Sequence, residues 1–425
     1  MDCEVLVVDI VEAPFGSLLE FVVDNRGRTC PTANAGIPLI ATNCVSNDAL
    51  YPKFENIRFV DEETYQSWFR SHPIPGDILF VLKGAPGRTC LVPDPVSFCV
   101  AQDMVALRPD RSKVDPQYLF AALRSARVQN AIVNMHVGTM IPHFKKGDFF
   151  RLKIPMPQPE MQIAIGSWYM EISRKIDLNR RMNETLEAMA RAIFQDWFVA
   201  FGPTRAKQEG RPPYLAPDLW SLFPNRLDDD GKPEGWVRGN LGQYMVNFDA
   251  KRVPVSNAER AKRKGPYPYH GATSVMDHVD NYLFDGTYVL VGEDGSVVKE
   301  NGAAFTQYVW GKIWVNNHAH VLQGTGSVST EQLLMYFQHE QVAPYVTGAV
   351  QLKLSQGRMN TMPFLFAGED VCRAFSRLVD PLFARLRSNV DEMRTLAATR
   401  DLLLPKLMSG ELRIRDAERV AETVL

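Results

Sequence analysis

The order of apolar runs and glycine-rich turns occurs twice in this 425-residue chain. Residues 76–82 (GDILFVL) and 286–292 (GTYVLVG) each place a turn before a short apolar run, which predicts a buried strand. Each copy continues with a second predicted strand and then a helix, at 100–109 and 115–125 in the first copy and at 315–323 and 330–340 in the second. Gly76 corresponds to Gly286, an offset of 210, and this self-similarity indicates two copies of one structural unit.

Each copy ends in a long segment, 161–199 or 371–409, whose apolar residues recur every seven positions. The matching residues are Ile165, Ile172, Leu186 and Ile193 in the first segment and Phe375, Leu382, Leu396 and Leu403 in the second. A heptad sustained over this length predicts a coiled coil, although a helix packed on its own domain is the alternative. Asn179 and Asn389 interrupt the two series near their midpoints, so antiparallel pairing should bring them face to face and fix the register.

Proline residues mark where the predicted elements begin and end. Pro381 and Pro405 lie inside the second helical segment, so we expect that helix to start late or kink and to end near Leu404. The segment 202–238 is rich in Pro, Gly and charge and is expected to be an extended connection. The predicted fold class is α+β, with two mixed α/β domains separated by two long helices that form an antiparallel coiled coil. The expected boundaries are 1–157, 158–201, 202–367 and 368–425.

The composition is typical of a soluble globular protein and does not indicate a nucleic-acid partner. The net charge is −2; residues 1–150 hold 14 Lys and Arg against 17 Asp and Glu, and residues 205–365 hold 16 against 16. A strongly basic domain would have indicated DNA, so the charge balance lowers that expectation. The six cysteines form no CxxC pair and are expected to be reduced and mostly buried. No apolar run approaches the roughly 18–20 residues that span a bilayer, and we expect a cytoplasmic protein.

Three patterns resemble catalytic sites but lack a residue that the chemistry requires. Arg211 stands before Pro212-Pro213-Tyr214 where an amino-methyltransferase needs an Asn, Asp or Ser to accept a hydrogen bond from the target amine. The acidic residues near 218 and 230 lie in turn-like sequence rather than on adjacent strands. His318 and His320 are two positions apart, which is more typical of a structural pair than of a metal site. We therefore expect neither catalytic residues nor a metal ligand set.

Particular segments of the chain resemble the specificity subunits of type I restriction-modification systems. They are KIDLNRRMNETLEAMARAIFQDWFVAFGP at 175–203, TMIPHFKKGDFFRLKIPMPQPEMQ at 139–162 and LLPKLMSGELRI at 403–414. The resemblance covers essentially the whole chain and is more specific in the helices than in the domains. It implies two target-recognition domains that read the halves of an asymmetric bipartite target, with helical spacers that dock the partner subunits. The implied partners are double-stranded DNA, two methyltransferase subunits and two restriction subunits, with no membrane. S-adenosylmethionine, ATP and Mg²⁺ would belong to those subunits and not to this chain.

Basic and polar residues in the predicted loops are the candidate DNA contacts, since phosphate and base contacts come mostly from such side chains. The candidates are Arg26, Arg28, Lys83, Arg88, Lys145, Lys146, Lys251, Arg252, Arg263, Lys353, Gln356 and Arg358. At any one position, ordinary solvated surface charge is the more common explanation. The run that contains Met189, Phe194, Trp197 and Phe198 is a candidate partner-binding surface, with burial inside the chain as the equal alternative.

Two other classes of function remain open at this point. One is a single-chain methyltransferase or nuclease, which the missing motifs disfavour. The other is a coiled-coil scaffold that binds only proteins. Sequence-selective, salt-dependent DNA binding would separate the specificity subunit from both.

Overall fold

The computed structural model describes residues 11–25, 29–135, 141–348 and 351–422. Contacts divide the chain into two compact units. The first unit comprises 1–181 together with 389–425, and the second comprises 182–388. Each unit therefore contains one globular copy of the repeat and part of each long helix. The sequence analysis instead placed the domain boundaries at the ends of the helices.

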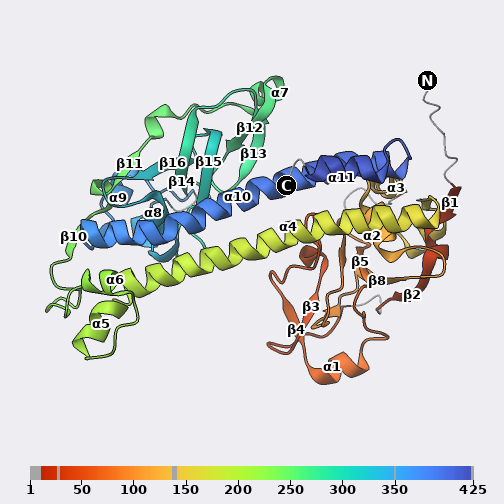
Figure 1. The fold of residues 1–425 in the computed structure, drawn as a ribbon, viewed down its shortest axis with the longest axis horizontal. Helices are drawn as coiled ribbons and strands as arrows, with labels where there is room; N and C mark the ends of the chain where they lie inside the picture. The colour runs from red at the N-terminus through yellow and green to blue at the C-terminus, as the bar shows by residue number, and fades with distance from the viewer. Residues whose placement is uncertain (1–10, 26–28, 136–140, 349–350, 423–425) are drawn as a thin grey trace. The chain divides into compact units, whose positions relative to one another are not determined.

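One antiparallel sheet, one mixed sheet and a short strand pair form the globular part of the first unit (Figure 1). The larger sheet has the order β2-β8-β5-β6, with bounds Leu19–Val23, Met104–Pro109, Ile78–Val81 and Thr89–Leu91. The smaller has the order β4-β3-β7, with bounds Arg58–Val60, Ile37–Ile40 and Cys99–Val100, and β3 and β7 are parallel. β1 (Val11–Pro14) pairs with β9 (Lys153–Met156), which leads into the first long helix. The strands predicted at 76–82 and 100–109 are confirmed as β5 and β8.

The helix predicted at 115–125 is confirmed as α2 (Pro116–Arg124). Asp115 caps it by accepting a hydrogen bond from the Tyr118 backbone N–H at 2.8 Å, and Pro116 takes the first helical position, where no N–H is needed. All residues from Tyr118 to Leu123 are buried. α3 (Ala126–Met135) follows directly, and the short α1 (Glu62–Ser67) lies beyond β4.

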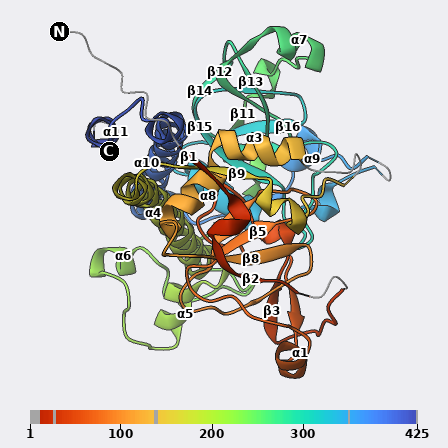
Figure 2. The ribbon, with the colours of Figure 1, turned by 90° about the vertical axis from the view of Figure 1, so that its right-hand side faces the viewer.

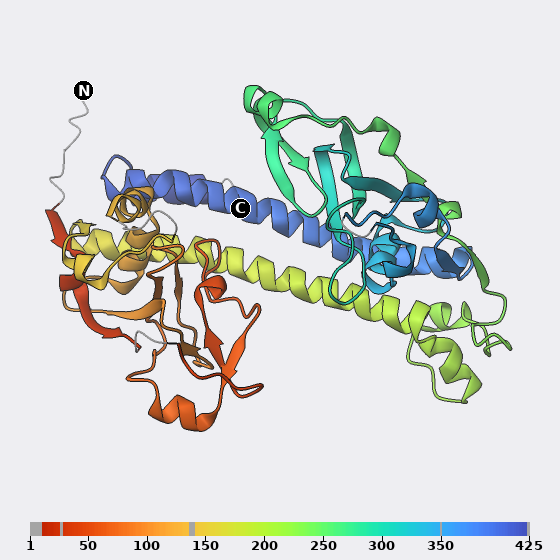
Figure 3. The same ribbon diagram turned by 180° about the vertical axis from the view of Figure 1, so that it is seen from behind.

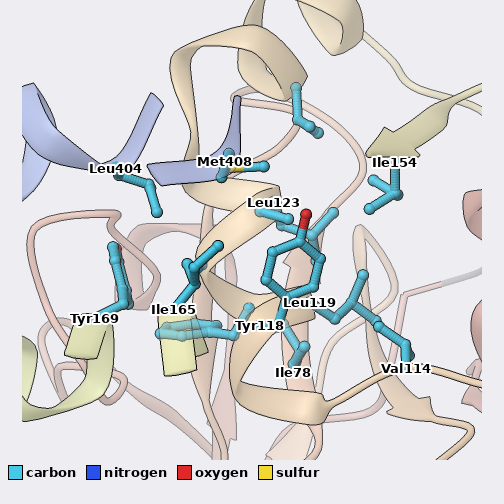
Figure 4. Packing of buried hydrophobic residues seen from close by; sticks show 14 of the residues in the cluster. Ile78, Val114, Tyr118, Leu119, Leu123, Ile154, Ile165, Tyr169, Leu404 and Met408 are labelled. Atoms are coloured by element: carbon cyan, nitrogen blue, oxygen red, sulfur yellow. The ribbon is translucent and has the colours of Figure 1, made fainter. Parts of the chain in front are cut away.

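The core of the first unit joins the globular part to the long helices (Figure 4). Tyr118 and Ile78 pack in one cluster with Ile165 of α4 (Pro159–Phe194) and Leu404 of α10 (Glu369–Met408). The end of α10, in blue, runs beside the start of α4, in yellow, in Figures 1 and 3. Ile78 and Leu404 are 326 positions apart in the sequence, so this cluster cannot form completely until the C-terminal helix is in place.

The two helices pair antiparallel in the first unit, as the heptads predicted. Lys175 forms an ion pair with Glu392 at 3.2 Å, and the Arg400 guanidinium stacks over the Tyr169 ring at 5.3 Å. Asn179 and Asn389 are both buried in this seam, with 1% and 0% of their surfaces exposed. The Asn179 amide donates to Glu392 Oε2 at 2.8 Å, so the polar centre of the seam also includes a charged residue one turn beyond Asn389.

The second unit contains one six-stranded sheet with the order β11-β16-β14-β15-β12-β13. The bounds are Met245–Asn247, Ala319–Gly324, Phe284–Gly292, Thr306–Val315, Lys264–His270 and Val275–Val279. β14 and β16 confirm the strands predicted at 286–292 and 315–323, and α8 (Thr330–His339) confirms the predicted helix. Figure 2 shows α7 (Asn257–Lys262) at the outer end of the hairpin β12–β13. β12 and β15 pair in parallel, as β3 and β7 do in the first unit, and β10 (Val237–Asn240) pairs with β17 (Pro363–Phe366) as β1 does with β9.

The predicted interruption of the second long helix is wrong, because α10 continues from Glu369 to Met408 through both prolines. A proline inside a helix loses one hydrogen bond and costs about 3 kcal/mol. Buried side chains on both sides of Pro381, Val379 and Phe383, offset this cost, and the Phe383 ring packs on Tyr308 of β15 at 4.9 Å. Pro405 lies within the last turn, where the seam residue Leu404 is 3% exposed.

The expectation of an extended connection over 202–238 is also wrong in part. Two short helices, α5 (Gly202–Gln208) and α6 (Pro217–Ser221), form in it, each with proline in the first turn. Phe223 and Trp236, which follow these helices, are buried, and the Phe223 ring lies 4.9 Å from that of Trp197.

The cysteines of the described residues are free and buried, as expected. Burial raises the pKa of the Cys90 thiol to about 12, which keeps the sulfur protonated and unreactive at neutral pH.

Gly166 of α4 allows α2 to approach that helix closely. A methyl group at this position would lie 2.6 Å from the Tyr118 backbone nitrogen and 2.7 Å from Asp115 Oδ1. We expect Gly166→Ala to destabilise the first unit by about 2 kcal/mol, although alanine favours a helix. Gly357→Ala in α9 (Gln356–Asn360) is the control, since nothing lies within 4 Å of a methyl group there. Thermal unfolding checks both, and a higher Tm for Gly166→Ala would contradict the close approach.

Candidate nucleic-acid interface

In the first unit, the ends of several strands bring separate loops to one edge of the larger sheet. β2 and β5 end there and β8 begins there, because β8 is antiparallel to both. The backbone N–H groups of Leu82 and Lys83 donate to Asp103 O, at 2.9 and 3.2 Å. Gly84 N–H donates to Pro142 O at 2.9 Å, which holds the loop after β5 against the segment that begins at 141.

Four of the predicted DNA contacts lie at this edge. Lys83 and Arg88 are exposed on the β5–β6 hairpin, and Lys145 and Lys146 are exposed on the segment beside it. Lys146 forms an ion pair with Asp24, just after β2. Arg26 and Arg28 lie outside the described residues. The edge therefore presents a group of exposed cations on backbone that is fixed by hydrogen bonds.

The corresponding edge of the second unit is held by buried ion pairs. Arg252 is the central residue: Nη1 donates to Glu293 Oε2 and to Ala319 O, each at 2.7 Å, and Nη2 lies 3.3 Å from Asp249 Oδ2. Lys353 adds a contact to Glu293 at 3.2 Å. The Arg252 side chain is only 12% exposed. Its contacts stabilise the loops after β11 and β14, so we assign it to positioning them rather than to touching DNA.

His320 completes this ionic network. It is fully buried, with Nδ1 2.5 Å from Asp249 Oδ2 and Nε2 2.7 Å from Leu354 O. Both partners accept hydrogen bonds, so the arrangement is satisfied when both ring nitrogens carry hydrogen. Burial raises the pKa of the Asp249 carboxyl, but the hydrogen bond and charge of His320 and the charge of Arg252 outweigh it and hold that pKa below its ordinary value.

Asp249, Glu293 and His320 also have the residue types of a metal site, with ligand atoms within 4.8 Å of one another. Arg252 bonds to both carboxylates and supplies the positive charge that a metal ion would bring. His318 instead pairs with Asp294. The geometry thus gives the two histidines separate roles within the fold.

The remaining candidates of the second unit lie on its surface or in surface ion pairs. Lys251 is exposed, with its ammonium 5.1 Å from the centre of the Phe248 ring. Gln356 and Arg358 are exposed on α9. Arg263 pairs with Asp280 at 2.9 Å and stacks over Trp314. Lys251, Gln356 and Arg358 are therefore the candidates of this unit whose polar groups are open to a ligand.

Most of the predicted partner surface near the end of α4 is buried inside the second unit. Phe194, Trp197 and Phe198 are at most 9% exposed, and the Phe198 ring lies 5.1 Å from that of Phe375 on α10. Met189 alone of these four residues is open, at 48%. The three aromatic residues are therefore part of the core of this unit, which was the alternative to a partner-binding surface.

Sequence reasoning missed the contacts that fix each globular part to the helices. Arg180 of α4 donates to Asp48 O at 2.7 Å in the first unit. In the second unit Arg387 of α10 lies 3.6 Å from Glu331 of α8, and the Tyr308 hydroxyl donates to the same carboxylate at 2.6 Å. No sequence signal identified these pairs, since each joins elements far apart along the chain.

Comparison with known proteins gives the class. Residues 21–188 match the family model for the type I restriction modification DNA specificity domain. A proposed type I restriction enzyme specificity subunit of Haemophilus influenzae, S.HindORF215P, is 32% identical over 133 residues, which cover 31% of this chain and 34% of that relative. The MjaIX specificity subunit of Methanocaldococcus jannaschii is 22% identical over 80% of this chain and 78% of its own length. The crystal structure of the S subunit of a type I system from M. genitalium has the same fold, with a TM-score of 0.54 and 16% identity over 96% of this chain and 98% of that one.

Residues 21–188 thus resemble a type I restriction modification DNA specificity domain. The chain is therefore similar to the specificity subunits of type I restriction-modification systems. Its mixed α/β halves and two long helices agree with that similarity. No helix among the described residues has the length and apolar character needed to cross a bilayer.

The ionic network of the second unit can be tested through Arg252. We expect Arg252→Ala to destabilise this unit by about 3 kcal/mol, because two largely buried carboxylates would remain without their shared cation. Lys251→Ala changes the exposed neighbour and serves as the matched control. Thermal unfolding of the two variants checks the prediction, and equal Tm values would refute it.

Proposed function

We propose that this chain is the non-catalytic subunit that gives a type I restriction-modification complex its DNA sequence specificity. Each unit would read one half of an asymmetric bipartite target, and the complex would contain two methyltransferase and two restriction subunits. S-adenosylmethionine, ATP and Mg²⁺ would be bound by those subunits. The observation that carries the proposal is the repeated framework with a different set of loops at the same sheet edge in each copy.

The two edges differ in the chemistry that they would offer to DNA. The first offers exposed lysines and an arginine, which suit phosphate contacts and guanine edges. The second offers an amide and an arginine on α9, next to loops that the Arg252 network holds in place. Two readers with unlike edges favour an asymmetric target over a palindrome.

The pattern of ion pairs also reconciles DNA binding with a net charge near zero. Much of the basic charge in the second unit is neutralised internally, as in the pairs of Arg260 and Lys264 with Asp277. Lys251, which precedes β12, and Arg358, on α9, remain exposed. Local phosphate contacts do not require a basic domain as a whole.

Lysines of the first edge should contribute to affinity without selecting bases. We expect Lys83→Ala and Lys145→Ala, each measured in the complex with the methyltransferase partner, to weaken binding to specific and non-specific duplexes alike by about tenfold. The slope of the logarithm of the binding constant against the logarithm of the salt concentration should fall in magnitude by about 1 for each lost phosphate contact. Lys113→Ala is the matched control, because Lys113 is an exposed lysine that follows the opposite end of β8. An equal effect of Lys113→Ala would contradict this edge as the interface.

The architecture of the target can be read from the source genome. We expect methylated adenines or cytosines within a motif of two specific parts separated by a gap of fixed length, detected by single-molecule sequencing. Deleting the gene for this chain should remove that methylation. A continuous palindrome would contradict two readers in one chain, and methylation by the purified chain alone would contradict a non-catalytic role.

A further inference from the structure

Each unit carries a short helix on the segment that precedes the strand leading into a long helix. These are the 3₁₀ helix η3 (Lys146–Phe150) in the first unit and α9 in the second, and the offset of 210 relates them residue for residue. Phe149 and Met359 correspond and are buried. Lys146 and Gln356 correspond and are exposed. The two helices therefore occupy equivalent positions of the repeated frame but offer different side chains to a ligand.

The backbone before each short helix is fixed to the sheet by a hydrogen bond of the same kind. Phe144 N–H donates to Leu82 O in the loop after β5, and Leu354 N–H donates to Glu293 O in the loop after β14, both at 2.8 Å. The side chains of Phe144 and Leu354 are both fully buried. This part of the attachment belongs to the frame that the two copies share.

A second bond fixes the same backbone in the second unit, and it comes from the fully buried His320 ring. Nε2 donates to the Leu354 carbonyl at 2.7 Å, and Nδ1 lies 2.5 Å from Asp249 Oδ2. Asp249 is in turn paired with Arg252. The ring therefore links Leu354 to the ionic network of this unit. A side chain without donors at this position would leave the Leu354 carbonyl and the Asp249 carboxylate short of a hydrogen bond.

The helix α9 begins two residues after this bond. Ser355 caps it, with its hydroxyl oxygen accepting from the Arg358 backbone N–H at 3.4 Å. A helix of five residues has little stability of its own, so its direction depends on the contacts at its two ends. The buried Met359 supplies one contact and Leu354 supplies the other. The bond from His320 to Leu354 therefore fixes the point at which the chain enters α9.

The first unit has an apolar residue at the position of His320. Phe80 and Val291 each lie two residues before the carbonyl that accepts the shared backbone bond. Phe80 is opposite Val105 in the β5–β8 pair, and Val291 is opposite His320 in the β14–β16 pair. Val105 is therefore the counterpart of His320, and its side chain cannot donate a hydrogen bond.

A different contact holds the short helix of the first unit. Lys146, the first residue of η3, forms its ion pair with Asp24 at the surface, where both side chains are partly exposed. The anchor is thus a surface ion pair in one copy and a buried histidine in the other. The copies share the frame and differ both in this anchor and in the side chains that the short helix exposes.

We propose that His320 is a positioning residue for DNA reading, which fixes the entry to α9 so that Gln356 and Arg358 meet base edges in one half of the target. This inference rests on the proposed function. Amide and guanidinium groups can bond bidentately to adenine and guanine edges, and a bidentate contact requires that the reading group be held within about 0.5 Å of its place. A buried link to the sheet meets that requirement for a helix too short to hold its own direction.

Hydrogen exchange measured by mass spectrometry on the full chain tests the anchoring. His320→Phe keeps an aromatic ring and removes both donors, so the amides of residues 355–362 should exchange about tenfold faster while those of β14 keep their rate. His320→Gln retains a donating amide and should have a smaller effect. His318→Gln is the matched control, because His318 binds Asp294 at the surface and not Leu354. Unchanged exchange of 355–362 in both His320 variants would overturn the proposal.

Base discrimination tests the reading role. The measurement is the ratio of affinities for the target duplex and for duplexes with substitutions in one half, made on the complex with the methyltransferase partner. Arg358→Ala and His320→Phe should each reduce discrimination by about tenfold in the same half and leave the other half unchanged. The double variant should discriminate no worse than the poorer single variant, because both changes remove one reading contact. A merely structural role of His320 would instead lower affinity for all duplexes equally.

The outcomes separate this inference from the function on which it rests. A wild-type complex without sequence selectivity would overturn the proposed function. A selective wild-type complex whose discrimination is unchanged by Arg358→Ala, or is reduced by Arg358→Ala but not by His320→Phe, would overturn the role of α9 or of His320 alone. If the His320→Phe chain does not fold, His320→Gln is used for both measurements, with a smaller loss expected in the same half.

Discussion

The seam between the two long helices is the constraint on which the rest of the molecule depends. It is part of the hydrophobic core of each unit, since Ile165 and Leu404 pack with Tyr118 in the first and Phe375 packs with Phe198 in the second. A helix pair of this kind cannot slide by one residue without moving apolar side chains out of both cores. Buried amides add to this constraint, because Asn183 donates to Leu386 O at 3.3 Å in the second unit.

A fixed seam gives each half a rigid frame and leaves one sheet edge free to vary. The frames share a contact of the same kind, in which a helix tyrosine bonds to the strand before the long helix: the Tyr118 hydroxyl donates to Pro155 O at 2.5 Å, and the Tyr336 hydroxyl donates to Pro363 O at 2.7 Å. The edges do not repeat. The offset that relates the copies replaces Lys83 with Glu293, so an exposed cation in one copy corresponds to the anion that binds Arg252 in the other.

The sequence predicts those parts of the fold that local periodicity determines. Apolar spacing shows directly which face of an element is buried. It therefore predicts the six strands and helices of the repeat and the heptads of the two long helices. The prediction from Pro381 is wrong because the tertiary contacts of Val379 and Phe383 outweigh the local effect of proline on a helix. Candidate site residues were harder to sort. Arg252 and Lys251 are adjacent and equally basic in sequence, yet only the fold reveals that one is enclosed by carboxylates and the other is exposed.

The same distinction explains why overall charge is a poor guide to this class of protein. Charge counted along the chain includes residues such as Arg252, whose field is cancelled within a few ångströms by Asp249 and Glu293. A ligand outside the protein responds to the cations that lack such close partners, and at physiological salt it does so within a Debye length of about 8 Å. Exposed cations such as Lys83 and Lys251 meet this condition. Under the proposed function, specificity would change by substitution at the edges while the buried pairs, which support the loops, keep the frame intact.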